Sequence, residues 1–291
     1  MSATEAQDVR WDAMTTHEVE IPHGRIRYRE AGSGRPIVFL HGVLVDGRLW
    51  RKVAPALTDQ NRVIVPDWPL GAHELPLNSG VDLALPGLAQ MVADFLAALD
   101  LADVVLVAND TGGAIAQQAV VDHPERIGAL VLTPCDSHSH FFPPILKYLT
   151  VMARLPGFGF MTAQTMRIRA LRESPTAFGL VNKHPMPDEV TQALLAPLRR
   201  HRHVRRDVGR LFRRVSSRYT RALLPRLGAF DKPVLIVWAS EDKLFPLANA
   251  EDLARRFPTA RLETVEDSYT FIPEDQPERL TELLRGFVAT A

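Results

Sequence analysis

Short apolar runs alternate with amphipathic stretches along the chain, a pattern that predicts strands alternating with helices. The apolar positions between Pro86 and Leu99 recur at the 3.6-residue spacing of a helix, and the proline suits its first turn. The predicted strands are 17–21, 25–29, 36–40, 63–65, 104–108, 129–132, 234–238 and 261–265, and the predicted helices are 49–57, 86–99, 114–123, 248–257 and 277–288. Such alternation indicates an α/β fold, a mostly parallel sheet with helices on both faces.

The alternation is interrupted between residues 137 and 230. This segment has helical patterns and many arginines and prolines, but no convincing buried strand. We therefore expect a core formed by 17–136 and 231–291, an N-terminal arm at 1–16, and an inserted helical cap at 137–230. The cap is expected over the carboxyl ends of the strands, where such sheets bind ligands.

The centre of the pattern is the apolar run that starts at Val104 and breaks at Asn109-Asp110-Thr111-Gly112-Gly113. A polar residue between a buried strand and a helix, flanked by small residues, is typical of a nucleophile elbow. Here the residue at the apex is Asp110, and a carboxylate can attack a substrate to form an ester that water later cleaves.

Composition narrows the function without identifying it. The 291 residues are 46% hydrophobic, carry a formal net charge of zero and include one cysteine, Cys135. A single cysteine excludes an intramolecular disulfide, and no apolar run approaches the ~20 residues that span a bilayer. We expect a cytoplasmic protein with a small-molecule substrate, no cofactor, and no nucleic-acid or membrane partner; whether it forms a homodimer stays open. His201 and His203 lack a third ligand at helical spacing, so no metal site is predicted.

The order of motifs resembles the α/β-hydrolase superfamily. The matching features are His41-Gly42, the stretch 67–73, the elbow, the cap insertion, and 240–246 after the penultimate strand. An Asp at the apex is similar to the branch of haloalkane dehalogenases and epoxide hydrolases. The resemblance implies Asp110 as nucleophile, backbone N–H groups of Val43 and Thr111 as the oxyanion hole, and Asp242 or Asp136 as the acid.

The sequence departs from that branch at several positions. The family's catalytic His corresponds to Thr270, within 267–273, and a threonine hydroxyl cannot act as a base at neutral pH. Dehalogenases carry a Trp directly after the nucleophile and a polar residue after His-Gly, where this chain has Thr111 and Val43. Epoxide hydrolases use two cap tyrosines, for which Tyr148 and Tyr219 are the candidates. Neither named activity follows from these positions alone.

Three functions remain open. The first is a hydrolase of a small, largely apolar molecule in which another base, His73 first among the candidates, activates water; a structural role for that histidine is the alternative. The others are a lyase or isomerase that uses Asp110 as acid or base, and a ligand-binding protein without turnover. The residues expected to contact substrate are Trp68, His138, Phe141, Tyr148, Tyr269 and Thr270, and the apolar stretches 141–144 and 155–161 with Met166 are expected to line the cap.

The segment 199–226 holds eleven arginines and one acid, Asp207. Its apolar residues recur at helical spacing, which predicts an amphipathic helix with a basic outer face. That face is either simply solvated or recruits an anionic substrate or partner.

Overall fold

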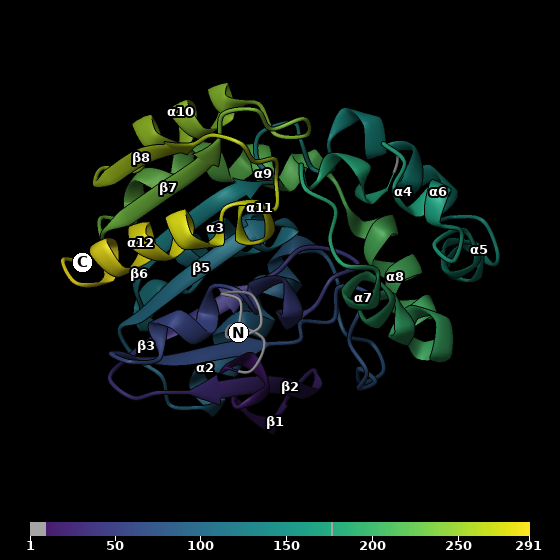
Figure 1. Cartoon of the computed structure of the whole chain (residues 1–291), viewed down its shortest axis with the longest axis horizontal. Helices are drawn as coiled ribbons and strands as arrows, with labels where there is room; N and C mark the ends of the chain where they lie inside the picture. Colours follow the sequence, from purple (N-terminus) through teal and green to yellow (C-terminus); the bar gives the residue numbers. More distant parts are fainter. Residues whose placement is uncertain (1–9, 176) are drawn as a thin grey trace.

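The computed structural model describes residues 10–175 and 177–291, and its centre is one eight-stranded sheet (Figure 1). The strand order is β1 (Thr15–Ile21), β2 (Gly24–Ala31), β4 (Asn61–Pro66), β3 (Arg35–Leu40), β5 (Val104–Asp110), β6 (Ile127–Cys135), β7 (Val234–Ala239) and β8 (Ala260–Val265). The pairs from β4 through β8 are parallel, whereas β2 runs antiparallel to both β1 and β4. The predicted fold class is confirmed.

Helices cover both faces of the sheet, and every residue of β5 and β7 is therefore buried. The core helices are α2 (Leu85–Ala98), α3 (Thr111–Asp122), α10 (Leu247–Arg256), α11 (Ile272–Asp275) and α12 (Pro277–Val288), with the short 3-10 turn η3 (Pro124–Arg126) after α3. In Figure 1, α12 crosses in front of the sheet.

The helix predicted at 49–57 is wrong. The structure has two 3-10 turns there instead, η1 (Gly47–Trp50) and η2 (Ala54–Leu57). Asp46 caps the first turn by accepting a hydrogen bond from the Arg48 N–H at 2.9 Å, and Pro55 lies in the first turn of the second. The apolar spacing of this stretch therefore marks burial against the sheet rather than one continuous helix.

The described part of 137–230 contains no strand. It folds into η4 (Pro144–Leu146), α4 (Tyr148–Met152), α5 (Phe158–Thr165), α6 (Arg169–Arg172), η5 (Phe178–Leu180), α7 (Asp188–Arg200), α8 (Arg202–Arg214), α9 (Ser217–Leu223) and η6 (Leu224–Ala229). Helices α4 to α8 lie to one side of the sheet, at the right of Figure 1, whereas α9 and η6 contact α3. Of the proposed arm, residues 1–9 lie outside the described part, and Thr15 and Thr16 already belong to β1.

Candidate active site

Asp110 lies at the sharp turn between β5 and α3, where the backbone is forced into an unusual conformation. Its φ is 53° and its ψ is −131°, a region that residues other than glycine rarely adopt. Neighbouring segments approach so closely that side chains are excluded. A Cβ on Gly112 would lie 2.7 Å from the His41 carbonyl oxygen, and one on Gly42 would lie 1.9 Å from Asp110 Oδ2. The small residues beside the apex are thus a steric requirement of the turn.

The carboxylate of Asp110 is held by the two backbone N–H groups expected to form the oxyanion hole. The Val43 N–H donates to Asp110 Oδ2 at 3.3 Å, and the Thr111 N–H also hydrogen-bonds the carboxylate. Burial raises the pKa of Asp110 to about 6, against the lowering effect of these two donors, and the charge of Asp242 raises it further. Asp110 is therefore ionised at neutral pH and becomes protonated as the pH falls through about 6.

His41 holds the loop that carries Val43. Its Nε2 accepts a hydrogen bond from the Trp68 N–H at 2.9 Å, which leaves Nδ1 to donate to the Gly42 carbonyl oxygen, also at 2.9 Å. Complete burial lowers the pKa of His41 to about 4. The imidazole is thus neutral and uses both nitrogens to position the backbone.

Thr270 lies beside Asp242, one of the two candidate acids. The Thr270 hydroxyl donates to Asp242 Oδ2 at 2.9 Å, while the Leu244 and Phe245 N–H groups each donate to Asp242 Oδ1 at 2.7 Å. Asn109 fixes the other side of this position, because its Nδ2 donates to the Thr270 carbonyl oxygen at 2.8 Å. Burial raises the pKa of Asp242 to about 6.

Asp136, the other candidate acid, supports the elbow from beneath. It is fully buried, and the Thr111 hydroxyl donates to its Oδ2 at 2.8 Å. Burial, and then the nearby charge of Asp110, hold the pKa of Asp136 well above its ordinary value. Asp136 therefore keeps its proton while Asp110 is ionised, and it does not line the cavity described next.

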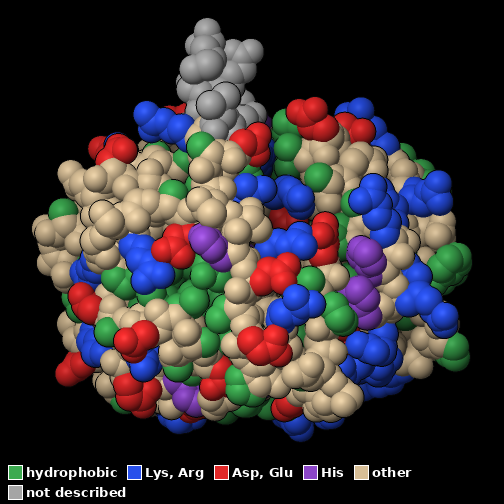
Figure 2. All heavy atoms as spheres, turned by 90° about the horizontal axis from the view of Figure 1, so that it is seen from below, with side chains coloured by type: hydrophobic (Ala, Val, Ile, Leu, Met, Phe, Trp, Pro, Cys, Tyr) green, Lys and Arg blue, Asp and Glu red, His purple; other side chains and the backbone are tan. Residues whose placement is uncertain are grey.

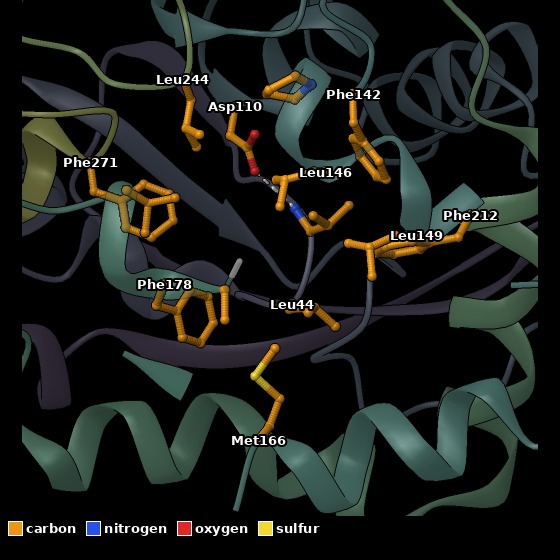
Figure 3. Close-up of a pocket in the computed structure, with 14 residues that line it drawn as sticks. Leu44, Asp110, Phe142, Leu146, Leu149, Met166, Phe178, Phe212, Leu244 and Phe271 are labelled. Atoms are coloured by element: carbon orange, nitrogen blue, oxygen red, sulfur yellow. Dashed lines mark hydrogen bonds between the residues drawn. The ribbon is translucent and has the colours of Figure 1, made fainter. Parts of the chain in front are cut away.

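An apolar cavity lies over Asp110 (Figure 3). Its volume is about 60 Å³, and since one water needs about 10–15 Å³ of such space, it holds only a few non-hydrogen atoms without rearrangement. Asp110 is the only ionisable side chain among the described residues that line it. The others are Val43, Leu44, Phe142, Pro143, Leu146, Leu149, Met166, Ala177, Phe178, Val181, Phe212, Leu244 and Phe271.

The structure does not bring the candidate histidines to this cavity. His73 is buried between the core and α8, with Nε2 3.7 Å from Asp207 Oδ2, and it is not a lining residue. His138 lies at the cap entrance, where its Nε2 is 2.7 Å from Asp252 Oδ2 and its Nδ1 is 2.9 Å from the Ser137 hydroxyl oxygen. Each ring faces an acid outside the cavity, so neither is placed to take a proton from water at Asp110.

None of the other five expected substrate contacts lines the cavity: Thr270 is buried beside Asp242, and the remaining four lie elsewhere. The Trp68 indole N–H donates to the Phe39 carbonyl oxygen at 3.0 Å in the core. Phe141 packs edge-on against Phe142, and only the second phenylalanine faces the cavity. Tyr148 is exposed, and Tyr269 lies under the Lys243 ammonium, 5.3 Å from the ring centroid.

The apolar stretches expected to line the cap are divided between its two sides. Phe142, Pro143 and Met166 line the cavity, whereas Leu155, Phe160 and Met161 are exposed. Sequence reasoning missed several lining residues, among them Leu146, Leu149, Phe178 and Phe271. No periodic signal marks them, because they come from short turns and from segments far apart along the chain.

Comparison with known proteins identifies the family. A model described as the alpha/beta hydrolase family matches residues 37–283, most of the chain. The chain belongs to this family. Among curated relatives, it is similar to haloalkane dehalogenase 2 of Mycobacterium tuberculosis, with 26% identity over 88% of this chain and 89% of that protein.

The chain is also similar to an esterase and to a second haloalkane dehalogenase. The chain is 27% identical to a pimeloyl-[acyl-carrier protein] methyl ester esterase of Aeromonas hydrophila, over 88% of this chain and 96% of the relative. A solved haloalkane dehalogenase, DatA from Agrobacterium tumefaciens, superimposes with a TM-score of 0.79 at 22% identity, covering 96% of this chain and 99% of that one. The structural likeness shows the shared fold; the reaction has to be argued from the site.

Proposed function

We propose that this α/β hydrolase acts on a small, largely apolar organic molecule through Asp110 as a carboxylate nucleophile. The observation that carries the proposal is the setting of Asp110: an ionised carboxylate, held by two N–H groups, facing a cavity whose other described lining residues are uncharged. Such a cavity excludes water from the carboxylate and binds an apolar substrate against it. The similarity to a haloalkane dehalogenase is consistent with this nucleophile.

In the first half-reaction, a carboxylate oxygen of Asp110 forms a bond to an electrophilic carbon. The carbon's bond to its leaving atom breaks, and the electron pair departs with that atom, a halide or the oxygen of an opened epoxide. The product is an ester of Asp110. No proton needs to be removed in this step, so the absence of a histidine among the described lining residues does not prevent it.

The second half-reaction is the hydrolysis of this ester, and it needs a base. Water attacks the ester carbonyl carbon, the Val43 and Thr111 N–H groups stabilise the negative oxygen, and a base takes the proton of the water. The bond from this carbon to the substrate oxygen then breaks, that oxygen receives the proton and leaves as an alcohol, and the Asp110 carboxylate is restored. At the position beside Asp242, Thr270 offers a hydroxyl that already donates to that carboxylate. We therefore expect ester hydrolysis to limit turnover.

A second candidate follows from the pKa of Asp110. A carboxyl group whose pKa is about 6 exchanges a proton readily near neutral pH. Asp110 would then move a proton of the substrate itself, in a lyase or isomerase reaction that needs neither an ester nor a second base.

Intact-protein mass spectrometry separates the two candidates. The protein is incubated with haloalkanes, epoxides and activated esters, and Asp110→Asn serves as the matched control. We expect a mass increase that maps to the peptide containing Asp110 and is absent in the variant. It should equal the substrate minus the leaving group together with one hydrogen (HX for a haloalkane), or the whole epoxide. Turnover that depends on Asp110 without any adduct would favour the second candidate, and no adduct with any compound would overturn the first.

The variant Thr270→His tests whether the lack of a base at this position limits hydrolysis of the ester. It places an imidazole beside Asp242, and a positioned general base contributes about 10²–10⁴-fold in rate. We expect the adduct to decay faster than in the wild type, with Thr270→Val as the control that also removes the hydroxyl without supplying a base. Equal decay in both folded variants would contradict the proposed role of this position.

A further inference from the structure

The cap carries all the large hydrophobic side chains that are strongly exposed in the described part of the chain. These nine residues are Ile145, Tyr148, Val151, Met152, Leu155, Phe160, Met161, Ile168 and Leu171. They define the outer cap patch, which spans η4, α4, α5 and α6. Scattered exposed hydrophobics are ordinary, but their concentration in one short segment indicates an interaction surface.

The patch is cationic as well as apolar. Residues 137–172 contain no Asp or Glu, and Lys147, Arg154, Arg167 and Arg169 are exposed among the hydrophobic side chains. In the view of Figure 2, Lys and Arg side chains gather at the cap side on the right, next to hydrophobic side chains at the edge.

A groove at the turn between α4 and α5 combines the two properties. Its volume is about 380 Å³, and Leu155 and Phe160 are among its lining residues. Helix α8 contributes Arg205, Arg206 and Arg213 to the lining, and Arg154 is the fourth arginine. The Arg154 side chain makes no hydrogen bond or ion pair with any other described residue, so its charge is available to an anion.

We propose that the outer cap patch docks on the surface of a bilayer that contains anionic phospholipids. Apolar side chains beside cations are the composition of segments that lie in a membrane interface, where the hydrophobic side chains enter the acyl region and Lys and Arg meet the headgroups. In the described part of the chain no helix is both long and apolar enough to cross a membrane, so the association would be peripheral.

A second copy of the chain fits the patch less well. A two-fold dimer through this surface would place the same patch against itself. Arg169 pairs with Glu173 at 2.8 Å, but Lys147, Arg154 and Arg167 of one copy would face the cations of the other, with no acid within 137–172 to pair with them. An anionic lipid surface supplies the missing negative charge.

The patch and the cavity share their elements. Leu146, Leu149 and Met166 line the cavity over Asp110, while their neighbours Ile145, Tyr148 and Arg167 face outward. Docking would therefore place the elements that cover the cavity against the bilayer, in which apolar molecules dissolve. Docking does not depend on the reaction at Asp110, so the two proposals fail separately.

Vesicle co-sedimentation tests the docking. The full chain is mixed with vesicles of phosphatidylcholine alone, or of phosphatidylcholine with phosphatidylglycerol, at low and high salt. We expect binding to the anionic vesicles that weakens as salt rises, because each cation near the surface contributes about fivefold to partitioning and is screened by salt. Equal binding to both vesicle types, or none to either, would overturn the proposal.

Two sets of variants locate the surface. Phe160→Ser with Met161→Ser removes side chains that are 55% and 60% exposed, and Arg154→Gln with Arg167→Gln removes two cations. We expect each pair to lower anionic-vesicle binding by about tenfold or more. The matched control pair, Arg261→Gln with Arg279→Gln, removes exposed arginines of the core and should bind as the wild type does.

Circular dichroism and the thermal midpoint verify that every variant is folded, and sedimentation velocity without lipid reports self-association. Concentration-dependent dimers that Phe160→Ser with Met161→Ser abolishes, together with vesicle binding unchanged in that variant, would identify the patch as a dimer interface and contradict the lipid proposal. Loss of binding in the control pair equal to that in the patch pair would show unspecific attraction by net charge, with the same consequence.

Discussion

Three buried carboxyl groups surround the elbow, and their protonation decides what the site can do. Burial, and then the charge of Asp110, raise the pKa of Asp136 well above its ordinary value, so Asp136 keeps its proton more readily than Asp110 does. Burial also raises the pKa of Asp242, but the N–H groups of Leu244 and Phe245 favour its charged form and lower that pKa again. The proposed nucleophile, Asp110, is thus the carboxylate with two N–H donors that lines the cavity.

This arrangement predicts how adduct formation depends on pH. Only ionised Asp110 can attack, and its pKa is about 6, so the rate should rise with pH, be half-maximal near that value and level off above it. The measurement is the initial rate of mass increase between acidic and mildly alkaline pH. Asp136→Asn replaces a neutral carboxyl by a neutral amide, so the midpoint of its profile should stay the same or move to lower pH. A flat profile in the wild type would contradict the assignment.

At the same scale, the residue positions expected from the sequence agree with the structure where a motif fixes the backbone. They differ where the expectation rested only on a residue's place in a loop. Asp110 lies at the turn after β5, where the elbow motif put it. The resemblance puts Thr270 at the family's histidine position, and the structure shows that its hydroxyl contacts Asp242, one of the two candidate acids. His73 was inferred from a loop expected to reach the rim of the cavity, but the ring turns toward Asp207 of α8. Sequence spacing gives the end of a strand and does not give the direction of a side chain in the loop that follows.

At the scale of elements, the elbow depends on how closely α3 approaches β6. A Cβ on Gly113 would lie 2.2 Å from the Cβ of Cys135, an atom that cannot move without its strand. We expect Gly113→Ala to destabilise the protein by about 1–3 kcal/mol through overpacking. The measurement is the free energy of unfolding in urea.

Gly286→Ala is the matched control for this prediction. Gly286 lies in α12, and nothing comes within 4 Å of its added Cβ. Because alanine favours a helix over glycine, this variant should be neutral or more stable by up to about 1 kcal/mol. Equal effects of the two alanines would show that the contact between α3 and β6 does not require the glycine.

Helices and strands were predicted well where the spacing of apolar residues matched a single type of element. The apolar period of α2 and the wholly apolar run of β5 each correspond to one structure, and both are present. The segment 137–230 is different, because Leu155, Phe160 and Met161, which the sequence assigns to an interior lining, are exposed in α5 and the turn before it. An apolar residue in a short helix indicates contact with something apolar, and it does not show which side that contact lies on.

At the scale of the whole molecule, net charge conceals how charge is distributed. Thirty-four basic and thirty-four acidic residues cancel, which led to the expectation of no membrane partner. The structure collects exposed cations and exposed hydrophobic side chains on one surface of the cap. The hydrophobic side chains and the four cations all lie within 145–171, so their composition can be read locally, whereas their exposure is known only from the structure.

The last long-range feature joins the C-terminal part of the chain to the segment after β3. Glu274, in α11, is buried and forms an ion pair with Arg51, and its Oε2 is 3.0 Å from both Arg51 Nη2 and Lys52 Nζ. Because α11 follows Thr270 directly, this pair also holds the position beside Asp242. Removing one partner of a buried pair leaves the other charge in a poorly solvated place, which costs about 3–5 kcal/mol.

Glu274→Gln should therefore lower the free energy of unfolding by about that amount, measured in urea. The matched control is Glu282→Gln in α12, whose partner Arg279 is solvent-exposed, and its effect should stay within about 0.5 kcal/mol. If Glu274→Gln were no more destabilising than this control, the ion pair would not be what ties α11 to the core.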